Sequence, residues 1–267
     1  MCGIAGYSLS PESSVKRTLA AQALLAGIAE RGADAVGYAH RGSSPFVTVH
    51  KRRSGASALL DEVHVPSAST QVLVHVRDYT KGHPTIEANN HPIRHGSVVG
   101  IHNGIIVNDE EILARYGFER AHPDMTVDSE AIFALAEHAE GSAKALEQLH
   151  GAMATAWLDE RNASVLFLAR AVGRPLWLGT ARRETFFAST RAALDLLEQT
   201  LRLSLRKREV DEGTLLRVED GSITRTERFK PDRSHVEETI LPAVRAPHEG
   251  ASCLQRLAAI ALAAHPL

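Results

Sequence analysis

The residue best able to act as a nucleophile is Cys2, which follows the start methionine in the opening segment MCGIAGYSLS. Methionine is normally removed before a small residue, so we expect the mature chain to begin at Cys2 with a free α-amino group. An N-terminal amine is an established base for a nucleophile. Its ordinary pKa of about 7.7–8.0 lies close to that of a thiol, about 8.5. The alternative is that Cys2 is one small residue of a strand.

An amide-cleaving site also needs hydrogen-bond donors where the carbonyl oxygen becomes negative. In the segment GIHNGIIVND, Asn103 offers a side-chain amide and Gly104 a main-chain N–H that no Cβ shields. An Asn-Gly pair between apolar runs is also a strong signal for a β-hairpin turn. The segment therefore predicts either an oxyanion hole or a turn.

Two charged residues could hold an amino-acid substrate. Arg77 ends the apolar run VLVHVR, and a guanidinium there could bind a carboxylate through two parallel hydrogen bonds. Asp128 precedes a helical pattern in MTVDSEAIF, where it could bind an ammonium group or simply cap the helix. The segment ERGADAVG, which contains Arg31, has the pattern of a helix end followed by a turn.

The bulk composition narrows the class of protein. The 267 residues carry a formal net charge of -2, which gives no overall attraction to nucleic acid or to a membrane surface. No apolar run reaches the roughly 18 residues of a membrane-spanning helix, and no signal peptide is apparent. Only Cys2 and Cys253 are cysteines, which favours a reducing cytoplasm. No spacing of ligands suggests a metal site.

Apolar periodicity and turn residues predict the elements that must position these residues. Helices are expected over 13–32, 108–117, 128–141, 191–202 and 251–267, and strands over 2–9, 70–77, 97–102, 152–160, 164–170, 175–180 and 184–190, with a hairpin over 213–229 that turns at Asp220-Gly221. Ser13 or Ser14 and Asn108 are the expected helix caps, and Gly117 is an expected helix stop. Strands in antiparallel runs with grouped helices predict an α+β fold.

Taken in order, the segments MCGIAGY, RGADAVG, HVRDYTKG, NNHP, IHNGIIVND and VDSE resemble the class II glutamine amidotransferase domain. This is the N-terminal-nucleophile (Ntn) glutaminase of glucosamine-6-phosphate synthase and amidophosphoribosyltransferase. The segments RPLWLG, FFASTRAALDLL and EGTLLRVEDG extend the resemblance, which covers roughly residues 2–225. It implies a four-layer αββα Ntn-hydrolase sandwich, with two antiparallel sheets between helical layers. We expect that domain over residues 2–229, and a linker and helical tail over 230–267.

The resemblance also implies the reaction and the role of each residue. Cys2 would attack the side-chain amide of glutamine, form a γ-glutamyl thioester and release ammonia, and its amino group would be the base. Asn103 and Gly104 would form the oxyanion hole. Arg77 would bind the substrate carboxylate and Asp128 its ammonium, while Thr80 and Arg31 would line or support the pocket. No metal and no cofactor would be needed.

Two residues and the length of the tail depart from that family's pattern. Asp78 stands where an aromatic residue usually follows the arginine, and Lys81 stands where a histidine is often seen. If the strand persists, the Asp78 side chain points away from Arg77. Only about 40 residues follow the resemblance, too few for a synthetase domain.

Three hypotheses follow. The first is a stand-alone glutaminase whose ammonia passes to a separate synthetase or acceptor subunit. The second is a self-contained amidase that acts on a γ-glutamyl compound or another small amide, and the third is a silent binding domain. The complete set of Cys2, Arg77, Asn103, Gly104 and Asp128 argues against the third.

Overall fold

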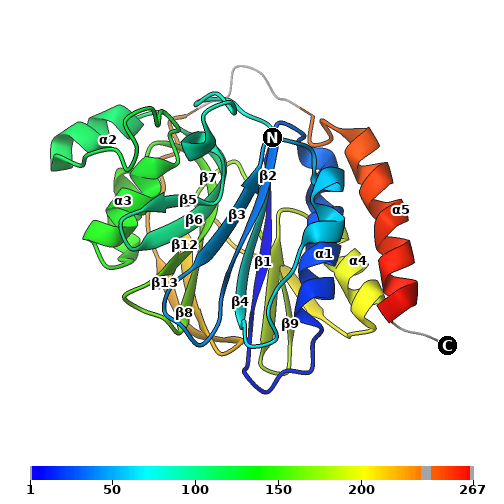
Figure 1. The fold of residues 1–267 in the computed structure, drawn as a ribbon. Coiled ribbons are helices and arrows are strands. Elements are labelled where there is room, and N and C mark those ends of the chain that lie inside the picture. The colour runs from blue at the N-terminus through cyan, green and yellow to red at the C-terminus, as the bar shows by residue number, and fades with distance from the viewer. Residues whose placement is uncertain (1, 236–241, 265–267) are drawn as a thin grey trace.

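Two antiparallel sheets form the centre of the molecule in the computed structural model, which describes residues 2–235 and 242–264 (Figure 1). The seven-stranded sheet has the order β11 (Arg206–Glu209), β9 (Trp177–Ala181), β10 (Glu184–Ala188), β1 (Gly3–Leu9), β4 (Gln71–Arg77), β2 (Ala35–Arg41), β3 (Thr48–Arg52). The six-stranded sheet has the order β13 (Ser222–Arg228), β12 (Thr214–Glu219), β8 (Val165–Arg170), β7 (Gly151–Asp159), β6 (Val98–Ile106), β5 (Ile93–His95).

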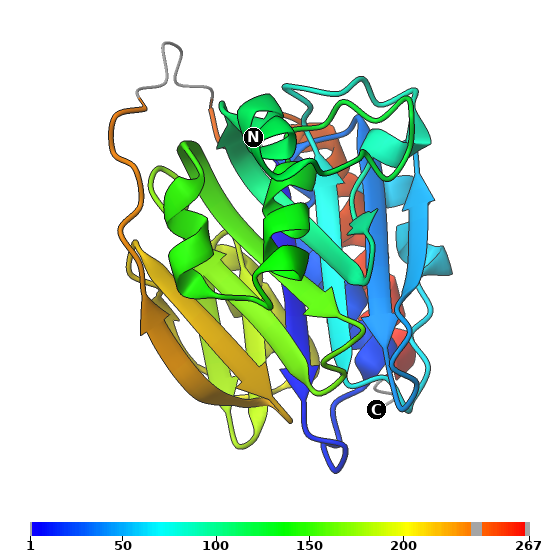
Figure 2. The same ribbon diagram turned by 90° about the vertical axis from the view of Figure 1, so that its left-hand side faces the viewer.

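Helices cover the outer face of each sheet, as Figures 1 and 2 show from two directions. The seven-stranded sheet is covered by α1 (Arg17–Ile28), α4 (Arg191–Leu201) and α5 (Pro247–Ala264), and the six-stranded sheet by α2 (Asp109–Tyr116) and α3 (Glu130–His138). Short 3₁₀ turns span Ala29–Arg31, Ala56–Ala58, Leu60–Glu62, Glu87–Asn89 and Ala143–Gln148. The predicted α+β sandwich is confirmed.

Strand alternation decides which side chains reach the space between the sheets. In β4, Val72, Val74 and Val76 pack with α1 in the outer core, while Leu73 belongs to the core between the sheets. Because successive side chains of a strand point to opposite faces, Arg77 lies on the same face as Leu73. The sequence VLVHVR therefore directs the Arg77 side chain to the interior between the sheets.

Helix α1 is apolar all round because it is covered on two sides. Leu24 and Leu25 are both fully buried, and the helix packs on the seven-stranded sheet and against α4 and α5. A helix without a polar face is expected where other elements enclose it.

Several local predictions need correction. The sequence reading missed β2, β3, β5 and β11, and it interpreted ERGADAVG as a turn although its last three residues, Ala35 to Gly37, begin β2. The hairpin alternative for Asn103-Gly104 is wrong, because β6 runs through both residues and pairs with β7 along Val98–Ile106. An unbroken partner strand keeps this segment extended.

Of the predicted helix caps and stops, only the stop at Gly117 is confirmed. α1 begins only at Arg17, and Lys16 precedes it with no side-chain cap, so neither Ser13 nor Ser14 caps it. The Asn108 side chain caps nothing either, because it donates to Gln148 O at 2.9 Å and accepts from His150 N at 2.9 Å. Gly117 does end α2, in a left-handed conformation with φ of 66°.

The hairpin and the tail were partly anticipated. Asp220 and Gly221 both have positive φ, 46° and 74°, as the predicted turn between β12 and β13 requires. α5 begins at Pro247, several residues before the expected start at 251. Part of the expected linker, 236–241, lies outside the described residues, and the domain boundary near 229 stays a prediction.

Candidate active site

Cys2 lies directly before β1, at the end of the sheet where β1 begins and the neighbouring strand β4 ends. The pairing of Gly3 with Val76 puts Cys2 opposite Arg77. Cys2 Sγ donates to the carbonyl oxygen of Asp78 at 3.5 Å, and the residue is half-buried. Burial raises the pKa of the Cys2 thiol, and the hydrogen bond to Asp78 and the charge of Arg77 act in the opposite direction.

Arg31 supports Cys2 from the 3₁₀ turn that follows α1. Its Nε donates to the carbonyl oxygen of Cys2 at 2.9 Å, and its side chain is buried. Gly3 leaves the space that this packing needs, since a Cβ there would lie 2.8 Å from Val76 and 3.1 Å from Arg31. The glycine beside Cys2 thus allows close packing of protein atoms. The supporting role of Arg31 in catalysis stays a prediction.

Asp34 is a residue of the site that sequence reasoning missed. Its main-chain N–H donates to the carbonyl oxygen of Arg77 at 3.0 Å, and its Oδ2 accepts from Tyr79 N at 2.9 Å. Gly32 lies so close that a Cβ would be 2.4 Å from the Arg77 carbonyl. The segment RGADAVG therefore holds the end of β4, and the only available signal was its place among the ordered motifs.

Arg77 binds the loop that follows it. Its Nη1 donates to Asn90 Oδ1 at 2.5 Å, and its Nη2 donates to Lys81 O at 2.9 Å and to Gly82 O. Asn90 in turn donates from Nδ2 to Pro84 O at 2.8 Å. Arg77 and Asn90 together fix residues 78–82, named here the substrate loop.

The substrate loop carries Thr80, Asp78 and Lys81. Thr80 is exposed within it. β4 ends at Arg77, and the carboxylate of Asp78 lies 3.2 Å from Nε of Arg245, so it points toward the tail of the chain. The strand does not persist to Asp78, so the condition of the earlier expectation is not met, and the ion pair with Arg245 orients this side chain instead.

Asn103 has unmatched hydrogen-bonding groups. Its side chain is fully buried, and among the described residues neither Nδ2 nor Oδ1 has a hydrogen-bond partner. A buried amide without partners costs free energy, so such a group is typical of a functional position. Asn103 is therefore free to donate to a ligand oxygen.

Gly104 follows in a conformation that only glycine tolerates. Its φ is 152°, and a Cβ there would lie 1.8 Å from the carbonyl oxygen of Ala152 and 2.6 Å from Nε2 of His102. The close approach of β7 thus requires glycine at this position.

Asp128 lies beside the same strand, at the start of the segment that leads into α3. Its Oδ2 accepts from Ile106 N at 2.7 Å, two residues after Gly104. Burial raises its pKa to about 6, while the Ile106 hydrogen bond and the charge of Lys81 lower it. Asp128 is buried and does not serve as a cap with a side-chain bond to the helix, because its carboxylate bonds the main chain of β6.

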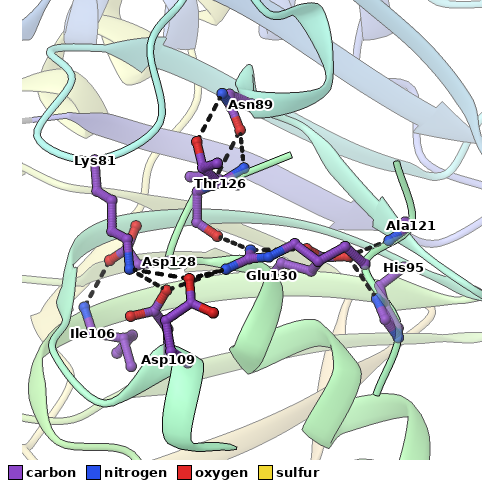
Figure 3. A network of polar contacts seen from close by, with 12 residues as sticks. Lys81, Asn89, His95, Ile106, Asp109, Ala121, Thr126, Asp128 and Glu130 are labelled. Atoms are coloured by element: carbon purple, nitrogen blue, oxygen red, sulfur yellow. Dashed lines mark hydrogen bonds and ion pairs between the residues drawn. The ribbon is translucent and has the colours of Figure 1, made fainter. Parts of the chain in front are cut away.

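A network of ion pairs surrounds Asp128 (Figure 3). Lys81 Nζ lies 2.5 Å from Oδ2 of the buried Asp109, which also lies 3.6 Å from Arg120. Arg120 pairs with Glu130 at 3.1 Å, and Glu130 accepts from His95 Nδ1 at 3.0 Å. These contacts tie the substrate loop and α2 to the start of α3.

Asn89 completes this framework. Its Oδ1 accepts from Thr126 N at 2.8 Å and from Val127 N at 3.1 Å, and its Nδ2 donates to His83 O at 3.2 Å. The segment NNHP therefore positions both Asp128, through Asn89, and Arg77, through Asn90. The motif was noticed in the sequence, but the task of each asparagine required the fold.

Two buried histidines lie near the site in the chain, His75 on β4 and His91 directly after Asn90. The rings of His75 and His91 stack with centroids 4.2 Å apart, and Nε2 of His75 donates to the carbonyl oxygen of His102 at 3.1 Å. Burial lowers the pKa of His75 to about 3 and that of His91 well below its usual value. Both rings are therefore neutral at ordinary pH.

Over 2–235 and 242–264, no cluster of three or more His, Cys, Asp or Glu side chains could hold a metal ion. Within the same ranges, no helix is both long and apolar enough to cross a bilayer.

Comparison with known proteins identifies relatives that match most of this chain. Residues 80–196 match the family model of a glutamine amidotransferase domain. The chain is 32% identical over 246 residues to glutamine--fructose-6-phosphate aminotransferase [isomerizing] of Vibrio vulnificus, with 85% of this chain and 38% of the relative covered. The enzyme of the same name from Escherichia coli O6:H1 is 32% identical over 210 residues, 73% of this chain and 32% of the relative.

Solved structures share the fold. Glutamine phosphoribosylpyrophosphate amidotransferase from B. subtilis superposes with a TM-score of 0.67 at 20% identity, over 86% of this chain and 50% of that one. A structure described as the allosteric regulatory enzyme of purine biosynthesis gives a TM-score of 0.66 at 22% identity. The chain spans about a third of the length of the curated relatives that it matches. The resemblance predicted from the ordered motifs is confirmed.

Proposed function

We propose that this chain, which carries a glutamine amidotransferase domain of class II, hydrolyses the side-chain amide of glutamine to glutamate and ammonia. The observation that carries the proposal is the position of Cys2 at the start of β1, opposite Arg77 at the end of β4. A sulfur nucleophile and a cation able to bind a carboxylate thus lie side by side, at the ends of two neighbouring strands. The buried, unpartnered amide of Asn103 supplies a donor on the facing sheet.

The reaction proceeds through a thioester. With Met1 removed, the α-amine of Cys2 takes the thiol proton, and Sγ attacks the side-chain carbonyl carbon of glutamine. Asn103 and the Gly104 N–H stabilise the oxygen as it becomes negative. The carbon–nitrogen bond breaks, the amine returns its proton to the departing ammonia, and water then hydrolyses the γ-glutamyl thioester to glutamate.

The charged residues hold the substrate. The ionised Asp128 binds the α-ammonium, and Arg77 binds the α-carboxylate with the donors that its bonds to Asn90, Lys81 and Gly82 leave over. Thr80 lines the entrance in the substrate loop, and Arg31 supports the Cys2 main chain. No metal or cofactor takes part in this proposal.

The experiment that tests the proposal is ammonia release from glutamine by the wild type and by Cys2→Ala, together with the N-terminal mass of the purified chain. We expect Cys2→Ala to abolish ammonia release and to keep the circular dichroism spectrum of the wild type. Ammonia release by the variant, or a retained Met1 in a fully active enzyme, would contradict the assigned nucleophile and base.

The acceptor of the ammonia is proposed to be a separate synthetase subunit in the cytoplasm. This rests on the curated relatives, which are named as aminotransferases that use glutamine. Ammonia release that rises when host extract is added, and a partner that co-purifies, would support it. Full turnover by the isolated chain, with no partner recovered, would count against it.

One observation favours a second candidate, a self-contained amidase for a γ-glutamyl compound or another small amide. Lys81 brings a positive charge to the Asp128 network, where it lowers the pKa of Asp128. This positive charge favours a substrate that carries a negative charge beyond that of glutamine. Comparison of kcat/KM on glutamine and on γ-glutamyl substrates separates the two, and a wide preference for glutamine would exclude the amidase.

A further inference from the structure

The C-terminal segment 245–264, named here the tail, packs back onto the sandwich. α5 lies against α1 (Figure 1). The side chains of Cys253 and Leu257 are buried in the core that α1 forms with the sheet. Glu249 accepts from Ser57 N at 2.8 Å, which fixes the start of α5 to the 3₁₀ turn at 56–58. The tail is therefore held in place independently of its contacts near Cys2.

Arg245 joins the tail to two elements that flank Cys2. Its main-chain N–H, together with that of Ala246, donates to the carbonyl oxygen of Glu30, each at 2.8 Å. Its Nε lies 3.2 Å from Oδ2 and 3.4 Å from Oδ1 of Asp78. One residue of the tail thus bonds both the 3₁₀ turn at 29–31 and the substrate loop.

Both of these elements bond Cys2 directly. Asp78 accepts the thiol hydrogen bond at its carbonyl oxygen, at 3.5 Å, and Arg31 donates to the carbonyl of Cys2 at 2.9 Å. Arg245 itself is not part of either bond. Its effect on Cys2 can therefore act only through the position of Asp78 and of the turn that contains Arg31.

The ion pair of Arg245 and Asp78 is partly shielded from water. The Asp78 side chain is 16% exposed and that of Arg245 37% exposed, so water screens the pair only in part. Partly exposed pairs of this kind contribute up to about 1 kcal/mol, which corresponds to roughly a fivefold change in an equilibrium. If a ligand binds only to the closed loop, its apparent affinity is proportional to the fraction of molecules in which the loop is closed.

We propose that Arg245 is a positioning residue: through Asp78 it holds the substrate loop closed over Cys2. The tail would thus be a working part of the glutaminase site, although it enters from the far end of the chain. The effect on catalysis rests on the proposed function, whereas the effect on the loop does not.

The first test is hydrogen–deuterium exchange on the full chain, which needs no substrate. In Arg245→Gln, the peptide that contains residues 78–82 should exchange about 3- to 5-fold faster, since the Tyr79 amide loses the geometry of its bond to Asp34. Arg256→Gln is the matched control, because Arg256 lies on α5 in the same tail and pairs with Asp61 of the 3₁₀ turn Leu60–Glu62, away from this loop. Its exchange in residues 78–82 should stay at the wild-type rate.

Companion variants keep the test specific to the ion pair. Asp78→Asn should accelerate exchange as Arg245→Gln does, and the double variant should be no faster than either single one. Arg245→Lys retains the charge and should restore exchange to within about twofold of the wild type. Unchanged exchange in Arg245→Gln, additive single variants, or an equal effect of Arg256→Gln would overturn the proposal.

Kinetics on glutamine then separate a positioning role from a general loss of stability. Arg245→Gln should raise KM about 3- to 5-fold and change kcat by less than twofold, whereas Arg256→Gln should leave both unchanged. An unaltered KM, with normal turnover, would contradict the catalytic part of the proposal. A wild type that does not release ammonia from glutamine would refute the proposed function, and the exchange result would still decide the role of Arg245.

Discussion

His75 and His102 join the two sheets next to the candidate site: Nε2 of His75 donates to the main-chain carbonyl oxygen of His102 at 3.1 Å. A carbonyl oxygen can only accept, so the His75 proton is on Nε2. The bond lies two residues before Arg77 on β4 and one residue before Asn103 on β6. The strands that carry Arg77 and Asn103, the proposed carboxylate-binding residue and oxyanion donor, are thereby fixed relative to one another.

Arg77→Ala should weaken the binding of glutamine. Loss of a charged hydrogen-bond donor costs about 1.5–3 kcal/mol, so we expect KM to rise roughly 10- to 150-fold. The melting temperature should fall as well, because Arg77 also bonds Asn90 and the substrate loop. The measurements are KM and a thermal melt. A lower melting temperature with an unchanged KM would reduce Arg77 to a purely structural residue.

Asn103→Ala should lower kcat by about 10²–10³, the usual effect of removing an oxyanion donor. Its stability should be unchanged or higher, because the substitution removes two buried polar atoms that have no partner among the described residues. Asn90→Ala is the control with the opposite pattern, since Asn90 is bonded on both sides and its loss should reduce stability. Normal turnover by Asn103→Ala would remove this residue from the oxyanion hole.

Asp128 should give KM a pH dependence. Burial raises the pKa of Asp128 to about 6, so the carboxylate that would bind the α-ammonium is lost as the pH falls through that value. We expect KM to rise up to tenfold per pH unit below about 6. Asp128→Asn should have a high KM that no longer depends on pH in this range. A flat KM in the wild type would contradict the assignment.

The same titration affects stability in the opposite sense to an ordinary ion pair. The folded-state pKa of Asp128 lies above the unfolded value of about 3.9, so its ionisation destabilises the fold progressively from about pH 4 to 6 and fully above pH 6. Asp128→Asn should therefore be more stable than the wild type at pH 7, by up to about 3 kcal/mol, and the difference should vanish near pH 4. Urea melts at both pH values measure it. The Asn side chain can keep the hydrogen bond from Ile106 N.

Gly104→Ala should destabilise the fold strongly. A Cβ would lie 1.8 Å from the Ala152 carbonyl oxygen, and φ is 152°. We expect a loss of more than about 3 kcal/mol, or failure to fold, because backbone must move as well as side chains. Gly117→Ala is the matched control: its φ is also positive, 66°, but nothing lies within 4 Å of the added atom. It should cost only about 1–2 kcal/mol. An equal loss of folding free energy in both variants would show that β7 can move away from the added Cβ at little cost.

The strands and helices that depend on local sequence patterns were the ones predicted correctly. The runs that became β1, β4, β7 and β8 are short, apolar and bounded by turn residues, and α4 follows from its periodicity. β2 was missed because AVGYAHR mixes glycine with polar residues. Its strand is fixed by neighbours on both sides, β4 and β3, which a local reading does not contain.

Some residues of the candidate site could be predicted from the sequence, and others could not. Cys2 has a reactive thiol, Arg77 and Asp128 are charged, and Asn103 carries an amide donor. All four could be named from their types and the ordered motifs. Asp34, Asn89 and Asn90 could not, because each acts by bonding main chain or a side chain distant in sequence. Arg245 is the extreme case, 167 positions from the aspartate with which it pairs.

The stacked pair of His75 and His91 makes the stability of the fold depend on pH. Burial holds both rings neutral when folded, with the pKa of His75 at about 3, whereas free histidine has a pKa of about 6.5. Between these values the unfolded chain binds more protons than the folded one, so acidification favours unfolding by proton uptake. The Asp128 titration near pH 6 lies at the upper edge of that range. Burial also lowers the pKa of His102 to about 3, so this ring adds to the same loss of stability in acid. The stability of the fold thus depends on pH through histidines that take no part in the proposed reaction.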